Sequence, residues 1–170
     1  MAGRVAAFGL VLVSALLVQS VWGAGLTVLG IRPDIVALTV VGFALAEGPG
    51  TGVRYGFAAG VALDLLAPQE HLVGLSALVL VFVGYGVGAL RRYLIGGELT
   101  AQVTAAAGAA ATIALARGVL QLLLGEPGEQ VIGLLWSIVG GAAYAALLAP
   151  FICRLAQGVA ARFPVVAPVG

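Results

Sequence analysis

The stretch Leu72–Leu90, LVGLSALVLVFVGYGVGAL, contains nineteen residues and no charged side chain. An uncharged apolar run of about 18 residues or more is typical of a helix that crosses a bilayer. Comparable apolar runs occupy Val5–Trp22, Leu99–Leu124 and Val131–Ile152. The stretch therefore predicts an all-α membrane protein, and much of the remaining chain repeats its pattern.

The composition supports a membrane protein and argues against several classes of ligand. The chain is 62% hydrophobic and only 9% charged, whereas soluble domains are about 45–50% apolar and about 25% charged. Its net charge of +1 does not suggest nucleic acid as a partner. The single cysteine, Cys153, cannot form an internal disulfide or a metal cage. We therefore expect neither a metal nor another cofactor.

Two shorter apolar segments, Pro33–Ala46 and Thr51–Ala67, are separated by a Glu-Gly-Pro-Gly turn signal. With the longer runs they bring the expected count to about six transmembrane segments, in a single integral membrane domain that spans residues 1–170. Because the second and third segments are short, both a tilted crossing and a re-entrant pair remain open.

The arginines predict the orientation, since cytoplasmic loops of membrane proteins are enriched in basic residues. If the N-terminus is cytoplasmic and six helices cross, Arg32 lies outside and Arg117 lies within a helix. The other six of the eight arginines then lie on the cytoplasmic side: Arg4, Arg54, Arg91, Arg92, Arg154 and Arg162. We therefore expect a multi-pass protein of the bacterial inner membrane with both termini in the cytoplasm.

The third segment carries small residues at every fourth position: Gly52, Gly56 and Gly60, followed in the same series by Asp64. This spacing places them on nearly one helical face, and glycines there let a second helix approach closely. A carboxylate in a membrane helix is costly unless it faces a partner. The face serves either packing within the bundle or the binding of another protein, and both interpretations remain open.

The sixth segment repeats the pattern with Gly133, Ser137 and Gly141. Small residues at this spacing again predict close helix packing. The partner helix could belong to this chain or to another protein.

Arg117 lies within the fifth segment, and its depth is similar to that of Asp64. An arginine at such a depth needs a counter-charge or a route to the headgroups. We predict an intramembrane pair of Asp64 and Arg117, with extension of Arg117 to the outer headgroups as the alternative.

Arg32, Pro33 and Asp34 begin the second segment. Proline at the first helical position loses no intrahelical hydrogen bond, and an aspartate in the first turn complements the helix dipole. These roles are structural. Arg32 is expected to pair locally or to contact a lipid headgroup.

Recognisable catalytic motifs are absent from the sequence. His71 is the only histidine, and no nucleophile is placed to form a pair with it. We therefore expect that the chain is not an enzyme.

The order of these features resembles the family of the rod shape-determining protein MreD. The resemblance rests on Arg-Pro-Asp at 32–34, Glu-Gly-Pro-Gly-Thr-Gly at 47–52, YGFAAGVALDLL at 55–66, GLSAL at 74–78 and the Arg-Arg pair at 91–92. Beyond residue 93 only the hydropathy is similar. The family's motif positions correspond here to Arg32, Pro33, Asp34, Gly56, Gly60, Asp64 and Gly74.

This resemblance implies a six-helix bundle similar to the substrate-binding subunits of energy-coupling-factor transporters. It also implies a non-catalytic scaffold of the bacterial elongation complex, which controls cell shape. MreC is the expected direct partner, with direct or indirect links to the RodA glycosyltransferase, its transpeptidase partner, MreB and membrane lipids. The main alternative is the substrate-binding subunit of a vitamin-type transporter, and a membrane enzyme is the third.

Overall fold

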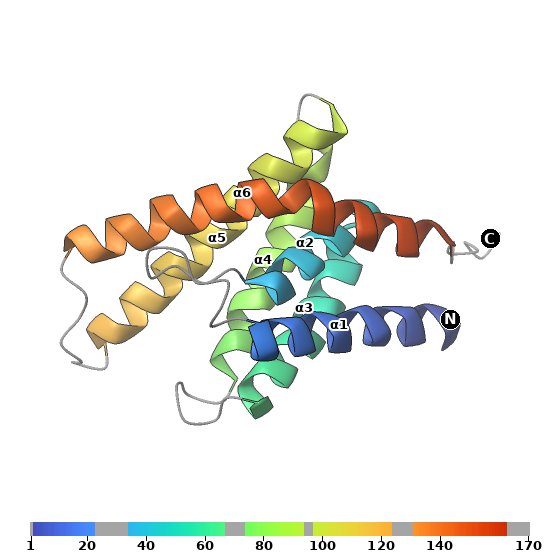
Figure 1. The fold of residues 1–170 in the computed structure, drawn as a ribbon, viewed down its shortest axis with the longest axis horizontal. Coiled ribbons are helices and arrows are strands. Elements are labelled where there is room, and N and C mark those ends of the chain that lie inside the picture. Colours follow the sequence, from blue (N-terminus) through green and yellow to red (C-terminus); the bar gives the residue numbers. More distant parts are fainter. Residues whose placement is uncertain (1, 23–33, 67–73, 94–96, 124–130, 163–170) are drawn as a thin grey trace.

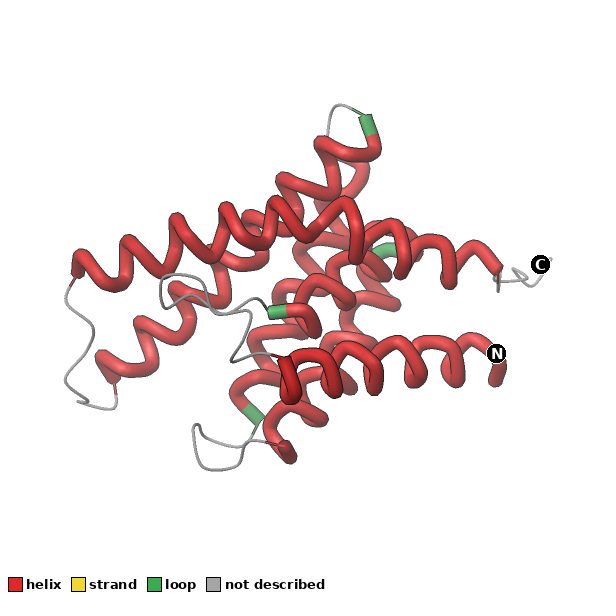
Figure 2. The backbone as a smooth tube through the Cα atoms, in the orientation of Figure 1, coloured by secondary structure: helices red, strands yellow, loops and turns green. Residues whose placement is uncertain are grey.

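The structure is a computed structural model, and it describes residues 2–22, 34–66, 74–93, 97–123 and 131–162. These ranges contain only helices, turns and short connections (Figures 1 and 2). The elements follow one another as α1 (Ala2–Trp22), α2 (Ile35–Glu47), α3 (Pro49–Leu66), α4 (Leu75–Leu90), the 3-10 turn η1 (Arg91–Tyr93), α5 (Glu98–Leu123) and α6 (Val131–Arg162). The all-α fold class is therefore confirmed.

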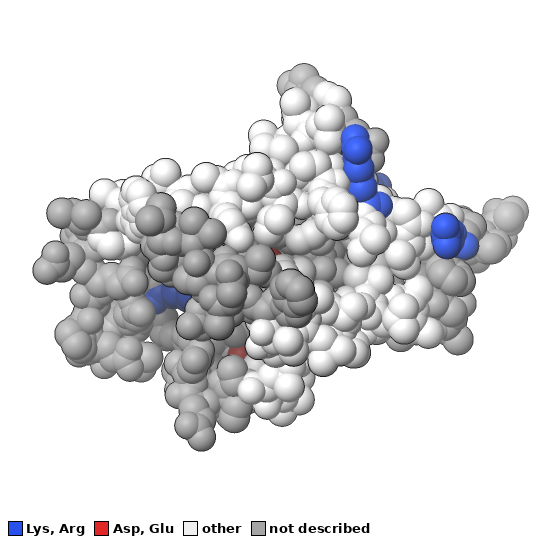
Figure 3. Space-filling view, in the orientation of Figure 1, with Lys and Arg blue, Asp and Glu red and all other residues white. Residues whose placement is uncertain are grey.

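Three stretches of the described chain are long and apolar enough to cross a membrane: Leu75–Tyr93, Leu99–Val119 and Leu135–Arg162. Ala6–Val21 and Ile35–Glu47 are shorter apolar helices. Large apolar side chains are exposed on the outside of the bundle, such as Phe151, which is 79% exposed. Among the described residues on the face drawn in Figure 3, most are uncharged, and the charged side chains form a few small patches. Lipid is the environment that such a surface requires.

Helix α2 forms the centre of the bundle. Its residues from Val36 to Ala44 are all buried, with α6, α3, α4 and α1 packed around it. Thirteen residues extend for only about 20 Å, at 1.5 Å per residue. Its apolar character on every side thus reflects burial within the protein. The second segment is short because it is a core helix.

One close contact at a glycine and one cluster of aromatic rings connect α2 to its neighbours. A Cβ atom on Gly42 would lie 2.7 Å from Cβ of Ala156 in α6, so this helix pair is in close contact. On another side, the rings of Phe8 and Tyr55 stack with centroids 3.8 Å apart, and the Phe43 ring packs edge-on against both. These contacts bring α1, α3 and α6 onto the central helix.

Two of the differences from the predicted helix boundaries have a clear physical meaning. Helix α6 continues through Pro150 as far as Arg162, although the apolar pattern predicted an end at Ile152. Asp34 precedes α2 as its N-cap, with its carboxylate accepting a hydrogen bond from the Ala37 amide at 2.9 Å. It was expected inside the first turn, but a capping carboxylate satisfies an amide that has no intrahelical partner.

Candidate functional site

The glycine face of α3 packs directly against α4. Cβ atoms on Gly52, Gly56 and Gly60 would overlap backbone atoms of Gly84, Leu80 and Ala77, respectively. All three glycines are buried. Without side chains between them, the two helices meet backbone to backbone. The face therefore serves packing within this chain, and another protein could use it only by separating α3 from α4.

Asp64 ends this face and caps the next helix. Its carboxylate accepts hydrogen bonds from the backbone amides of Gly74 at 2.8 Å, Ser76 at 3.3 Å and Ala77 at 3.4 Å. The first amides of a helix have no intrahelical acceptor, and Gly74 has no side chain with which to cap α4. The buried carboxylate from α3 satisfies them instead.

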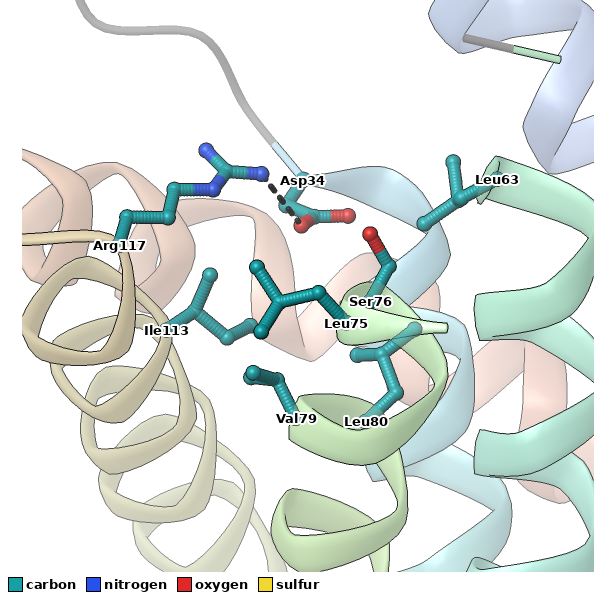
Figure 4. Close-up of a pocket in the computed structure, with 8 residues that line it drawn as sticks. All are labelled: Asp34, Leu63, Leu75, Ser76, Val79, Leu80, Ile113 and Arg117. Carbon is teal, nitrogen blue, oxygen red and sulfur yellow. Dashed lines mark ion pairs between the residues drawn. The ribbon is translucent and has the colours of Figure 1, made fainter. Parts of the chain in front are cut away.

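The expected Asp64–Arg117 pair is corrected by the structure. Arg117 Nη2 lies 3.9 Å from Oδ2 of Asp34, while the Asp64 carboxylate is engaged by the amides of α4. The two residues were matched by depth along their helices. The depth of a residue along its helix does not determine the direction in which its side chain points around the helix axis. Arg117 extends from α5 towards the start of α2 (Figure 4).

A pocket lies beside this ion pair, where the first residues of α2 and α4 meet the ends of α3 and α5. Its interior volume is about 40 Å³, and the wider space of about 420 Å³ includes the part open to the outside. Figure 4 shows Arg117, Asp34 and the Ser76 hydroxyl along one side, with apolar side chains below them. We call it the Asp34–Arg117 pocket, and its lining is Asp34, Leu63, Leu75, Ser76, Val79, Leu80, Ile113 and Arg117.

The small-residue face of α6 divides into two parts. Gly133 and Ser137 are half-buried, and a Cβ on Gly141 would have no atom within 4 Å. From Ala145 and Ala149 onwards the same face is buried in the bundle. The second part packs within the chain, whereas the α6 face at Gly141 leaves room for another helix.

A further open surface lies between α4 and α5. The groove has an interior volume of about 240 Å³, and the wider space of about 630 Å³ includes the part open to the outside. Cβ atoms on Gly86 and Gly108 would have no atom within 4 Å. We call it the α4–α5 groove, and its lining is Phe82, Val83, Gly86, Val87, Leu90, Thr104, Ala105, Gly108, Ala109 and Thr112.

Arg91 has a contact that the sequence did not reveal. Its Nη1 donates a hydrogen bond to the Ala46 carbonyl at 3.1 Å, near the end of α2. From the sequence, Arg91 was placed only on the cytoplasmic side, in the Arg-Arg pair at 91–92. In the structure its side chain connects the end of α4 to the α2–α3 turn.

Two glutamine contacts were also missed. Gln19 Oε1 accepts a hydrogen bond from the Val36 amide at 3.1 Å, so α1 supplies a second cap for α2. Gln102 Nε2 donates to Gln157 Oε1 at 2.8 Å, which joins α5 to α6. Gln102 shares a buried face with Ala106 and Ala109. In the sequence, the sign of this contact was Gln102, a single polar residue on an alanine-rich face of α5.

Three residues considered in the sequence analysis lie outside the described part of the chain: Arg32, Pro33 and His71. Among the described residues, no group of three histidine, cysteine, aspartate or glutamate side chains could hold a metal. The polar groups discussed above instead cap helices or connect them.

An apolar exterior, a helical bundle and three helices of membrane-crossing length define the class as an integral membrane protein. Within that class, the profile of the rod shape-determining protein MreD matches residues 4–159. The chain therefore belongs to this family, and the resemblance noted in its motifs is confirmed. No curated protein and no solved structure matches the chain.

Proposed function

We propose that the chain is a non-catalytic membrane scaffold of the bacterial rod complex, which controls cell shape by binding MreC. Through that contact it is linked to RodA, its transpeptidase partner and MreB. The observation that carries this proposal is the family match over residues 4–159. The described polar groups support it, because Asp64, Arg91 and Gln102 act between helices of the chain itself.

The proposed arrangement is a single domain with six crossings in the inner membrane and both termini in the cytoplasm. The arginine distribution supports this orientation. The start of α1 and the end of α6 lie on the same side of the bundle in Figure 1, which supports an even number of crossings. The expected likeness to substrate-binding subunits of energy-coupling-factor transporters remains part of the proposal and concerns the fold alone.

We place the partner-binding surfaces where small residues remain open, rather than on the α3 face. The α4–α5 groove and the α6 face at Gly141 both meet this condition. Small residues allow the backbone of a partner helix to come close, which favours association within lipid. Because a Cβ at Gly108 or Gly141 would meet no atom within 4 Å, leucine there should obstruct a partner helix more than it disturbs packing within the described chain.

The test is affinity purification of the tagged full chain from gently solubilised membranes. Gly108→Leu and Gly141→Leu are compared with the unsubstituted chain, with protein abundance measured in parallel. Recovery of MreC that falls at least fivefold in one variant, at unchanged abundance, is the expected result. Failure to recover MreC with the unsubstituted chain would contradict the scaffold proposal. Full recovery with both variants would contradict the placement of the surfaces.

A further inference from the structure

The Asp34–Arg117 pocket combines one cation, one anion and an apolar floor. Arg117 and Asp34 face each other across its rim at 3.9 Å, and the Ser76 hydroxyl points toward the same space (Figure 4). Below them the lining is aliphatic: Leu63, Leu75, Val79, Leu80 and Ile113. A ligand that fills this pocket must therefore be amphiphilic, with charges of both signs at its polar end.

The side chains of Arg117 and Asp34 can each form further hydrogen bonds or ion pairs with a ligand. A guanidinium has five N–H donors, and among the described residues Arg117 reaches a carboxylate only at Asp34, near the limit of an ion pair. Its side chain is 59% exposed. Asp34 uses Oδ1 to cap α2 and turns Oδ2 toward Arg117. Both groups can contact a ligand without giving up the helix cap.

The position of the pocket in the bilayer narrows the choice of ligand. Arg117 lies six residues before the end of α5 at Leu123, which is about 9 Å along the helix at 1.5 Å per residue. The long arginine side chain can extend from this depth to the region where acyl chains give way to headgroups. Arginine binds phosphate bidentately and readily. A phosphate at this depth is normally part of a lipid.

We propose that the pocket binds a zwitterionic phospholipid whose headgroup carries a phosphate and a primary ammonium. The phosphate contacts Arg117, the ammonium contacts Asp34, and the first part of an acyl chain lies on the aliphatic floor. A bare phosphate would be repelled by the Asp34 carboxylate and would leave the floor unused. This inference does not depend on the scaffold role, because it requires no protein partner.

The test measures lipid retention by the purified full chain with native mass spectrometry. Phosphatidylethanolamine and phosphatidylglycerol are supplied in equal amounts, and the expected preference for the former is at least tenfold, or about 1.4 kcal/mol. Arg117→Gln should reduce retention of both lipids at least tenfold. Asp34→Asn should remove the preference, while asparagine continues to cap α2. Arg154→Gln, which alters an exposed arginine in α6 that does not line the pocket, should change nothing.

Two further measurements test whether the bound phosphate belongs to a lipid and whether lost retention reflects the pocket rather than misfolding. Soluble phosphoethanolamine should not displace the lipid at equal concentration, and displacement would overturn the assignment to a lipid. Val79→Phe, which fills the pocket from α4, should reduce retention at an unchanged melting temperature. Equal retention by the Arg117→Gln and Arg154→Gln variants, with both folded, would overturn the proposal. Equal retention of the two lipids by the unsubstituted chain would overturn the role of Asp34.

Discussion

The Asp64 carboxylate accepts a hydrogen bond from the Gly74 amide at 2.8 Å, so α3 caps the first turn of α4. The two residues are ten positions apart and belong to an antiparallel pair of helices whose glycines are in backbone contact. The cap and the glycine face therefore stabilise the same unit. Asp64 holds one end of the pair, and its role follows from the amides that it satisfies.

Replacement of Asp64 with alanine should destabilise the fold. The loss of a helix cap costs about 0.5–2 kcal/mol, and unsatisfied buried amides cost about 1–3 kcal/mol. Asp64→Asn should fall between alanine and the native residue, because an amide oxygen still accepts. Chemical denaturation in detergent measures the difference. Arg117→Ala is the matched control, and an equal loss of stability in both would restore the predicted Asp64–Arg117 pair.

Alanine at Gly56 should also destabilise the protein, because its Cβ would overlap the Leu80 carbonyl. Such overpacking costs about 1–3 kcal/mol. Gly86→Ala provides the matched control in α4, since its Cβ would meet no atom within 4 Å. The melting temperature of the Gly56→Ala variant should therefore be clearly lower than that of the Gly86→Ala variant. Similar melting temperatures would show that α3 and α4 are not in backbone contact.

The contact between α2 and α6 can be tested by a compensating pair of substitutions. Gly42→Ala should destabilise by about 1–3 kcal/mol, because the new methyl group would lie 2.7 Å from Cβ of Ala156. Ala156→Gly removes that Cβ and should restore part of the loss. Recovery stays partial, since the Cys153 Cα would lie 3.1 Å away and glycine within a helix costs about 0.5–1 kcal/mol. Strictly additive effects in a double-mutant cycle would refute the contact.

The α2–α3 turn should tolerate a change at Arg91 better than a change at Gly48. Gly48 has φ 96° and ψ −173°, a region in which other residues are strained by about 1–3 kcal/mol. Gly48→Ala should therefore lower the melting temperature more than Arg91→Ala, which removes one exposed hydrogen bond. Gly50→Ala, two residues later in open space, should be neutral. A neutral Gly48→Ala variant would show that the turn adopts another conformation.

The helices could be predicted from the sequence to a large extent. Glu98–Leu123 and Leu75–Leu90 lie close to the predicted apolar runs, because lipid selects continuous apolar length. The prediction for α2 recognised an apolar helix but did not identify it as the core. Burial in protein and burial in lipid select the same residues, so hydropathy does not distinguish them.

The candidate site was predicted less well. Four-residue spacing correctly grouped Gly52, Gly56, Gly60 and Asp64 on one face, because helical periodicity is local. It did not reveal that α4 covers this face. Arg117 was assigned to Asp64, although Asp34 lies nearer in the structure, since matching by depth ignores the rotation of each helix.

The sequence by itself determined that this protein is a helical membrane protein of the MreD family, because apolar length, turn residues and motif order are read along one chain. The tertiary structure alone decided that the α3 glycines meet α4, that Asp64 caps that helix and that Arg117 faces Asp34. These contacts join residues from different helices. They depend on how each helix is rotated and displaced against its neighbours, and close packing of the whole bundle sets those quantities.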